Sequence, residues 1–128
     1  MARTRRTGFT LIELLIVVVI IGILASIAIP KFSNTKEKAY MAAMRTDLRN
    51  LATAQESYFY SNGIYTTNPL ALNFTNSPGV VLSIPEATSK GWSGLATHPL
   101  AAAIKCALFM GTATPIAPAT VEGQVTCN

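Results

Sequence analysis

Hydrophobic and polar positions divide the chain into four zones. A basic start at residues 1–8 precedes an apolar run at 9–30, an amphipathic stretch at 31–61 and a Gly-, Pro- and Thr-rich remainder at 62–128. No internal repeat is visible in the sequence. The zones therefore predict one polypeptide with an apolar N-terminal segment and a single small globular domain after it.

The apolar zone has the length of a membrane span. Between Phe9 and Ile29 the apolar sequence is interrupted only by Thr10, Glu13, Gly22 and Ser26. A helix of this length, at ~1.5 Å per residue, covers about 31 Å and matches a hydrocarbon core of roughly 30 Å. We therefore expect residues 9–30 to form a transmembrane helix.

The amphipathic zone continues the helix. Its larger side chains recur with helical spacing, with Gln55 at the one polar turn: Met41, Met44, Leu48, Leu51 and Tyr58. Asn62-Gly63 supplies residues that tolerate the left-handed conformation in which many helices end. Pro30 lacks the N–H that would bond the Ser26 carbonyl, and Gly22 adds conformational freedom. The pattern predicts one helix over about residues 9–61, kinked or interrupted near Gly22–Pro30.

Short segments punctuated by glycine follow an irregular connection over 62–78. They are candidate strands at Val80–Ile84, Trp92–Thr97, Ile104–Met110 and Thr120–Thr126. The expected fold class is α+β, in which the C-terminal half of the long helix packs on a small antiparallel sheet of about four strands.

Charge is sparse and unevenly distributed. Charged residues make up 12% of the chain, and the net charge of +4 includes Arg3, Arg5 and Arg6 ahead of the apolar run. The apolar zone argues against a soluble cytoplasmic enzyme. The basic excess belongs to the start of the chain, so a nucleic-acid partner is possible but unsupported.

Glu13 is an unusual residue for an apolar span. A carboxylate costs something like 2.5–3.5 kcal/mol at the bilayer centre and less near its edge, so it either reaches the membrane surface or needs a cationic partner. No Lys or Arg lies between Thr7 and Pro30. A cut before Phe9 would create that cation as a new α-amino group.

These residues carry a family resemblance. The sequence Gly8-Phe9-Thr10-Leu11-Ile12-Glu13 follows Arg5-Arg6-Thr7, and the apolar run ends at Pro30. The segment resembles the processing site and N-terminal segment of type IV pilins. The likeness is strong over about residues 5–32 and looser through the amphipathic helix.

The resemblance implies roles for three residues. Gly8 would be the last residue of a basic leader, removed by a prepilin peptidase that also methylates the new N-terminal Phe9. Glu13 would pair with the Phe9 amine of a neighbouring subunit, and residues 9–30 would then hold a homopolymer together. A membrane assembly platform and assembly ATPases are the further partners that the family implies.

The two cysteines add a topological expectation. Cys106 and Cys127 lie 21 positions apart, without metal-ligand spacing, and a single His cannot complete a zinc site with them. The spacing is also similar to the disulfide-closed loop of many pilins. We expect a structural disulfide, which requires the C-terminal part to lie outside the cytoplasm.

The expected organisation is a leader at 1–8, a transmembrane and polymerisation helix at 9–30, and a globular pilin domain at 31–128. That domain comprises the amphipathic helix at 31–61, the loop at 62–78, and the sheet with its C-terminal disulfide loop at 79–128. We find no catalytic constellation, metal site or phosphate loop in the sequence, and expect no cofactor and no enzymatic activity. His98 is expected to have a surface or packing role.

The predicted function is that of a structural subunit, the major pilin, of a type IV pilus. It would begin as a single-pass inner-membrane prepilin with its N-terminus in the cytoplasm and end in a surface filament. The alternatives are a minor pilin or a pseudopilin of a type II secretion system, although only Glu86 and Glu122 are acidic after Glu56, few for that family's calcium loop. A monomeric membrane-anchored binding module and a secreted enzyme starting at Ile29 remain as different classes. Nothing in residues 62–128 chooses among motility, adhesion and DNA uptake.

Overall fold

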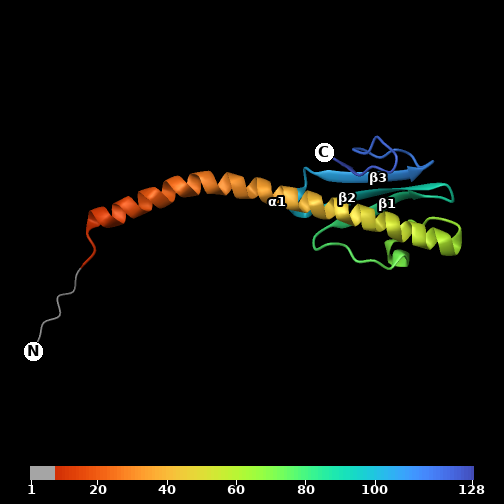
Figure 1. The fold of residues 1–128 in the computed structure, drawn as a ribbon, viewed down its shortest axis with the longest axis horizontal. Coiled ribbons are helices and arrows are strands. Elements are labelled where there is room, and N and C mark those ends of the chain that lie inside the picture. Colours follow the sequence, from red (N-terminus) through yellow and green to blue (C-terminus); the bar gives the residue numbers. More distant parts are fainter. Residues whose placement is uncertain (1–7) are drawn as a thin grey trace, which may run out of the picture. The chain divides into compact units, whose positions relative to one another are not determined.

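The structure, a computed structural model, describes residues 8–128, so most of the predicted leader, residues 1–7, lies outside the described residues. The chain divides into two compact units, one ending at Thr35 and the other covering Lys36–Asn128 (Figure 1).

A single α-helix, α1, runs through Leu11–Asn62. Of the two predicted forms, kinked or interrupted near Gly22–Pro30, the interruption is wrong, because the helix continues through both residues (Figure 1). Proline removes one backbone donor, while the surrounding residues keep their own helical hydrogen bonds. The Ser26 hydroxyl also donates to the Ile23 carbonyl at 2.7 Å within this stretch.

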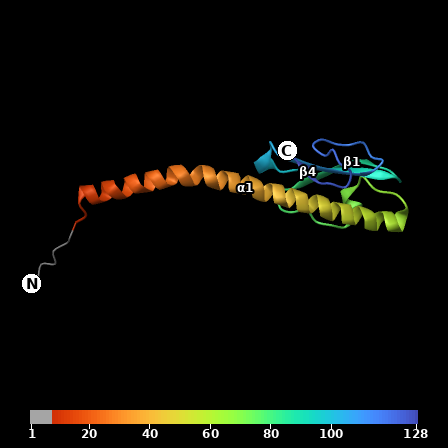
Figure 2. The same cartoon turned by 45° about the horizontal axis from the view of Figure 1, so that its top comes forward.

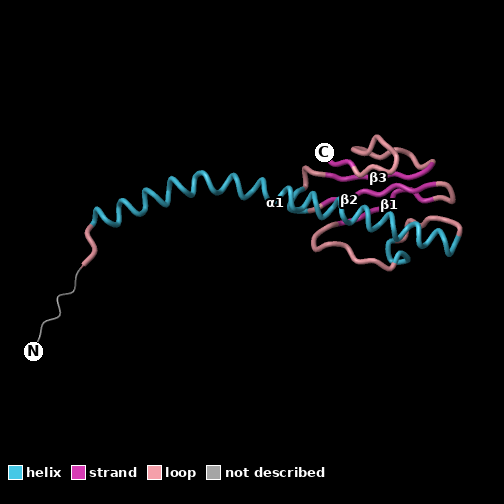
Figure 3. Tube along the Cα trace, viewed as in Figure 1, coloured by secondary structure: helices cyan, strands magenta, loops and turns pink. Residues whose placement is uncertain are grey.

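The second unit contains the β-sheet. Its strands are β1 (Val81–Ala87), β2 (Gly91–Thr97), β3 (Lys105–Gly111) and β4 (Thr126–Cys127), which pair antiparallel in the order β1-β2-β3-β4 (Figure 3). Two short 3₁₀ helices, η1 (Pro69–Leu72) and η2 (Pro99–Ala101), lie in the connections. The α+β fold class is therefore confirmed.

Three of the predicted strands agree closely with the structure, and the fourth does not. A strand over Thr120–Thr126 is wrong because only Thr126 and Cys127 pair with β3. The residues before them form turns: Gly123 has a positive φ of 73°, and Gln124 N–H bonds the Val121 carbonyl at 3.3 Å. These turns use backbone groups that a strand would offer to its neighbour.

One face of the sheet packs against the part of α1 that lies in the second unit (Figures 1 and 2). The buried core on this face joins α1, the loop at 63–80 and the first three strands; its members are Met44, Leu48, Leu51, Leu72, Val80, Ile84, Trp92, Ala96, Cys106 and Leu108. Gly94 of β2 allows the close approach, since a Cβ there would lie 3.0 Å from Leu51 Cδ2. The amphipathic period of α1 is thus explained by burial against the sheet.

The opposite face of the sheet is covered by the chain's own C-terminal segment. Ala107 and Phe109 of β3 point to this side because they alternate with Cys106 and Leu108. They form a second buried cluster with Ala113 and Ala119, which come from the segment after β3. At β2 and β3 the sheet is therefore covered on both faces, by a helix and by a loop.

Two buried polar side chains of α1 hold the loop that follows the helix. Asp47 accepts hydrogen bonds from Ser77 N–H at 2.7 Å and from Ser77 Oγ at 2.8 Å. Gln55 donates to the Thr66 carbonyl at 2.7 Å and accepts from Thr66 N–H at 3.1 Å. Both side chains are almost completely buried, so the loop is fixed by helix residues on the core side.

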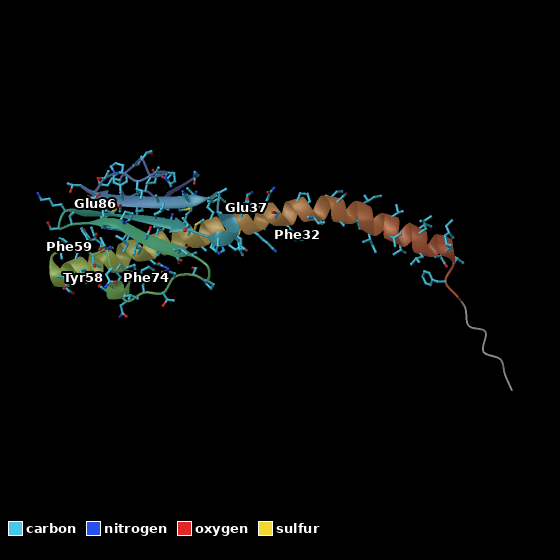
Figure 4. The ribbon with its side chains drawn as sticks, turned by 180° about the vertical axis from the view of Figure 1, so that it is seen from behind. Phe32, Glu37, Tyr58, Phe59, Phe74 and Glu86 are labelled. Atoms are coloured by element: carbon cyan, nitrogen blue, oxygen red, sulfur yellow. A yellow bond between two sulfur atoms is a disulfide. The ribbon has the colours of Figure 1, made fainter. Side chains whose placement is uncertain are left out.

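Aromatic residues pack around the C-terminal part of α1 and the loop that follows it. Phe59 stacks on Tyr65 with ring centroids 4.6 Å apart, and Tyr58 packs against the helix-facing core, as does Phe74 of the loop (Figure 4). The Tyr65 hydroxyl donates to Glu56 at 2.9 Å. Burial, followed by the hydrogen bond and the negative charge of Glu56, raises the pKa of Tyr65.

Candidate functional site

The first turn of α1 is closed by Thr10 and Glu13. Thr10 N–H and Thr10 Oγ1 both donate to Glu13 Oε2, at 2.8 Å and 2.6 Å, and Glu13 N–H donates to Thr10 Oγ1 at 3.3 Å. This is a capping box, in which a Thr before the first helical residue and a Glu three positions later satisfy each other's backbone donors. The sequence predicted Glu13 as a site residue, but not this local role.

The capping box leaves part of Glu13 available. Both hydrogen bonds fall on Oε2, and no donor from the described residues 8–128 reaches Oε1. The box uses Thr10 rather than Phe9, so a chain cut between Gly8 and Phe9 would keep it. Glu13 can therefore cap its own helix while offering one oxygen to an external cation.

The helix that Glu13 helps to cap carries an exposed apolar surface. Phe9, Leu11 and Ile12 are 79%, 84% and 63% exposed. The most apolar window of α1 has a mean hydropathy of 3.0 and no buried share, so α1 is apolar and long enough to cross a membrane. Figure 4 shows side chains standing out as sticks along this helix, with Phe32 labelled among them. Such a large apolar surface on a folded chain indicates a membrane or protein contact.

Gly22 and Pro30 lie within this exposed surface. Both are exposed, and a Cβ added at Gly22 would meet nothing within 4 Å. Neither residue is required by packing inside the chain. Both residues are therefore available to contact lipid or another protein.

The second predicted site is the cysteine pair, and the structure joins Cys106 to Cys127 by a disulfide. The two residues are directly opposed in the β3–β4 register. Cys106 is fully buried in the helix-facing core, whereas Cys127 is half-buried. The bridge fixes the end of the chain to the sheet, on the side that α1 covers.

His98 occupies a packing position. Its ring stacks on Tyr40 with centroids 4.0 Å apart, its Nδ1 accepts from Leu100 N–H at 3.1 Å, and the side chain is 4% exposed. Within residues 8–128 there is no group of three or more His, Cys, Asp or Glu side chains that could hold a metal ion. Among the described residues, the candidate functional groups are the capping box of Thr10 and Glu13 and the Cys106–Cys127 disulfide.

Sequence reasoning missed Asp47 and its hydrogen bonds to Ser77. A lone aspartate among polar helix residues looks like part of a solvent-facing surface. A weak signal was present, because Asp47 is next to Leu48 and three residues after Met44, on the apolar side of the helix.

Comparison with known proteins agrees with the N-terminal geometry. The prokaryotic N-terminal methylation motif matches residues 3–29. The type IV major pilin protein PilA of Myxococcus xanthus is 44% identical over 75 residues, 59% of this chain and 34% of that protein. The type II secretion system core protein G of Vibrio cholerae is 43% identical over 68 residues, 53% of this chain and 47% of that protein. The chain thus spans about a third to a half of the length of these two relatives.

A third relative is matched over most of its length. The type IV wide pilus major component PilA4 of Thermus thermophilus is 37% identical over 95 residues, covering 71% of this chain and 72% of that protein. The chain belongs to the type IV pilin family. Pilin and secretion-system relatives both match it, so family membership accounts for the capped apolar helix and the sheet but does not by itself separate these two kinds of subunit.

Proposed function

We propose that the chain is a structural subunit, the major pilin, of a type IV pilus. The observation that carries the proposal is an exposed apolar helix whose first turn presents one carboxylate oxygen, Oε1 of Glu13, without a partner among the described residues. A processing site two residues before that helix would supply the matching cation. The globular unit would then form the outside of the filament.

The proposed processing removes residues 1–8. A prepilin peptidase cuts between Gly8 and Phe9 and methylates the Phe9 amine. The leader holds three of the ten basic residues, so the processed chain has seven basic residues against six acidic ones. The chain is anchored in the inner membrane by residues 9–30 before assembly, with the disulfide-bearing unit outside the cytoplasm.

In the proposed filament, Glu13 of one subunit pairs with the Phe9 amine of its neighbour. A charge buried without its partner is strongly unfavourable, so the pair selects one register among apolar helices that could otherwise slide. Cohesion comes from the apolar surface itself. Burial of about 1,000 Å² per subunit at ~25 cal/mol per Å² corresponds to roughly 25 kcal/mol before entropic costs.

The test replaces Glu13 by Gln, which is close in shape and removes the charge. We expect normal cleavage at Gly8 and a folded globular unit. The yield of surface filaments should fall by about tenfold or more, since no charge pair then selects the register of the helices. Mass spectrometry of the mature N-terminus, circular dichroism and filament yield after shearing measure the three properties. Glu37→Gln, an exposed carboxylate of the same helix, is the matched control. Normal filament yield from Glu13→Gln would reject the pairing.

The similarity to a secretion-system core protein supports a second candidate, a pseudopilin of a type II secretion system. Deletion of the chain's gene separates the two candidates. Loss of surface filaments with intact exoprotein secretion supports the pilus subunit, and the reverse supports the pseudopilin. A chain that stays monomeric in detergent and in membranes would instead support an anchored binding module.

A further inference from the structure

The two sulfurs of the disulfide have unequal surroundings. Cys106 is fully buried among apolar side chains, while Cys127, the second-last residue, is half-buried. Cys127 Sγ also accepts a hydrogen bond from Arg45 Nε at 3.3 Å. One sulfur therefore lies in an apolar interior, and the other lies beside a cation and closer to solvent.

These surroundings favour one thiol over the other as the nucleophile when the chain is reduced. Thiolate, rather than thiol, attacks a disulfide, and a thiolate is disfavoured in an apolar interior and stabilised beside a guanidinium. We propose that Cys127 is the thiol through which the chain is oxidised, with Arg45 as a positioning residue that stabilises and orients its thiolate. The reaction partner is a molecule that carries a disulfide.

The oxidation takes place in two thiol–disulfide exchange steps. Cys127 thiolate attacks the oxidant's disulfide, which breaks and leaves as one thiolate, and a mixed disulfide forms on Cys127. Cys106 then attacks Cys127 Sγ, and its proton passes to the oxidant's second sulfur, which leaves as a thiol. The oxidant's disulfide is reduced to two thiols while the Cys106–Cys127 disulfide forms.

Contacts that do not depend on the sulfur atoms align the two thiols for the second step. Lys105 N–H donates to Asn128 Oδ1 at 2.8 Å, and Asn128 N–H donates to the Lys105 carbonyl at 3.2 Å. Ala107 pairs with Thr126 in the same register. The end of the chain can therefore lie along β3 before the disulfide closes, with Cys127 opposite Cys106.

A surface groove lies beside Arg45, the hydrogen-bond partner of Cys127. Its lining includes Arg45 and Arg49 of α1, Met110 of β3 and Val125, two residues before Cys127. Arg49 lines the same groove but makes no hydrogen bond to Cys127. It is therefore the matched control for the charge of Arg45.

The first measurement uses the reduced wild-type chain in detergent. A substoichiometric amount of N-ethylmaleimide, an uncharged thiolate reagent, is added, and peptide mass mapping reads which cysteine is alkylated first. We expect about tenfold more label on Cys127 than on Cys106, and equal labelling in concentrated urea, where the two surroundings are lost. Equal or preferential labelling of Cys106 in the absence of urea would overturn the proposal.

The second measurement follows mixed-disulfide formation with hydroxyethyl disulfide, which is uncharged. In the Cys106→Ala background the Cys127 thiol should react about tenfold faster than the Cys106 thiol does in the Cys127→Ala background. Arg45→Met should slow the Cys127 reaction several-fold, whereas Arg49→Met should leave it unchanged. If the two arginine substitutions had equal effects, Arg45 would act only through the general positive charge of this surface, and its positioning role would be rejected.

Discussion

Asp47 and Gln55 show how single polar residues decide the conformation of a long connection. Each projects from the buried side of α1 and bonds backbone groups of the loop, at Ser77 and Thr66. A loop of mixed polar composition has no hydrophobic pattern to define its path. The two side chains supply that path, because buried N–H and carbonyl groups need partners.

Removal of the Asp47 carboxylate should destabilise the globular unit. In Asp47→Ala, Ser77 N–H and Oγ lose their acceptor, and a buried unsatisfied donor costs about 1–3 kcal/mol. Ser77→Ala removes only the hydroxyl bond and should cost less, roughly 0.5–1.5 kcal/mol. Thermal unfolding of the full chain in detergent, followed by circular dichroism, measures both. An Asp47→Ala chain that melts at the wild-type temperature would contradict this account of the loop.

Tyr65 should make the unit sensitive to alkali. Because the pKa of Tyr65 is raised in the folded chain, the neutral phenol is favoured there, and its contribution to stability is complete below the ordinary value of 10.0 and lost as the pH rises through the folded pKa. Unfolding of wild type and Tyr65→Phe should therefore differ at pH 8, and the difference should shrink only as the pH passes through the raised folded pKa of Tyr65, since the variant has no phenol to ionise. A difference in melting temperature that does not change with pH would show that the pKa of Tyr65 is not raised by folding.

At the level of elements, hydrophobic periodicity was sufficient for α1 and for the first three strands. Met44, Leu48 and Leu51 follow the helical period because they face the sheet. Glycine stands two residues before β1, at the start of β2 and at the end of β3. The path of residues 112–125 could not be predicted in the same way. Ala113, Ile116 and Ala119 pack on the outer face of the sheet from turns, whose packing side chains follow no fixed period.

The candidate site was predictable to the extent that its chemistry is local in sequence. The capping box lies within four residues, and the order Gly8, Phe9, Glu13 is legible without a fold. The contact between Arg45 and Cys127 joins residues 82 positions apart. It depends on the β3–β4 register, which a two-residue strand does not reveal in the sequence.

Residues 112–120 should detach from the sheet when a side chain on the outer face of β3 is removed. They should stay attached when a side chain on the face toward α1 is removed. Phe109→Ala removes the largest member of the outer cluster and should cost roughly 3–5 kcal/mol, mostly by freeing residues 112–120. Leu108→Ala, at the adjacent position facing α1, should cost about 2–5 kcal/mol by weakening the main core. Limited proteolysis distinguishes them: early cleavage within 112–120 is expected only for Phe109→Ala. Equal cleavage rates there would show that the outer cluster does not hold the segment.

On the scale of the whole molecule, the two units have different energetic sources. The first unit buries almost none of its apolar surface within the chain, so its stability depends on lipid or on other subunits. The second unit draws its two cores, its disulfide and its loop contacts from residues after Lys36. Folding is therefore a property of the second unit, and the proposed assembly would depend on the first.

This division predicts that a chain of residues 35–128 folds alone and does not assemble. Thr35 would stand before the shortened helix, where a Thr side chain can cap it. Both buried clusters remain complete, because the helix-facing core begins at Met41 and the outer cluster has no member before Leu95. We expect a monomer without detergent, an intact Cys106–Cys127 disulfide, and a melting temperature within about 5 °C of the full chain, a difference of ~1 kcal/mol. Light scattering, non-reducing mass analysis and circular dichroism measure these properties. An unfolded product would show that residues 8–34 stabilise the globular unit, and filaments formed by the shortened chain would show that assembly does not depend on the apolar helix.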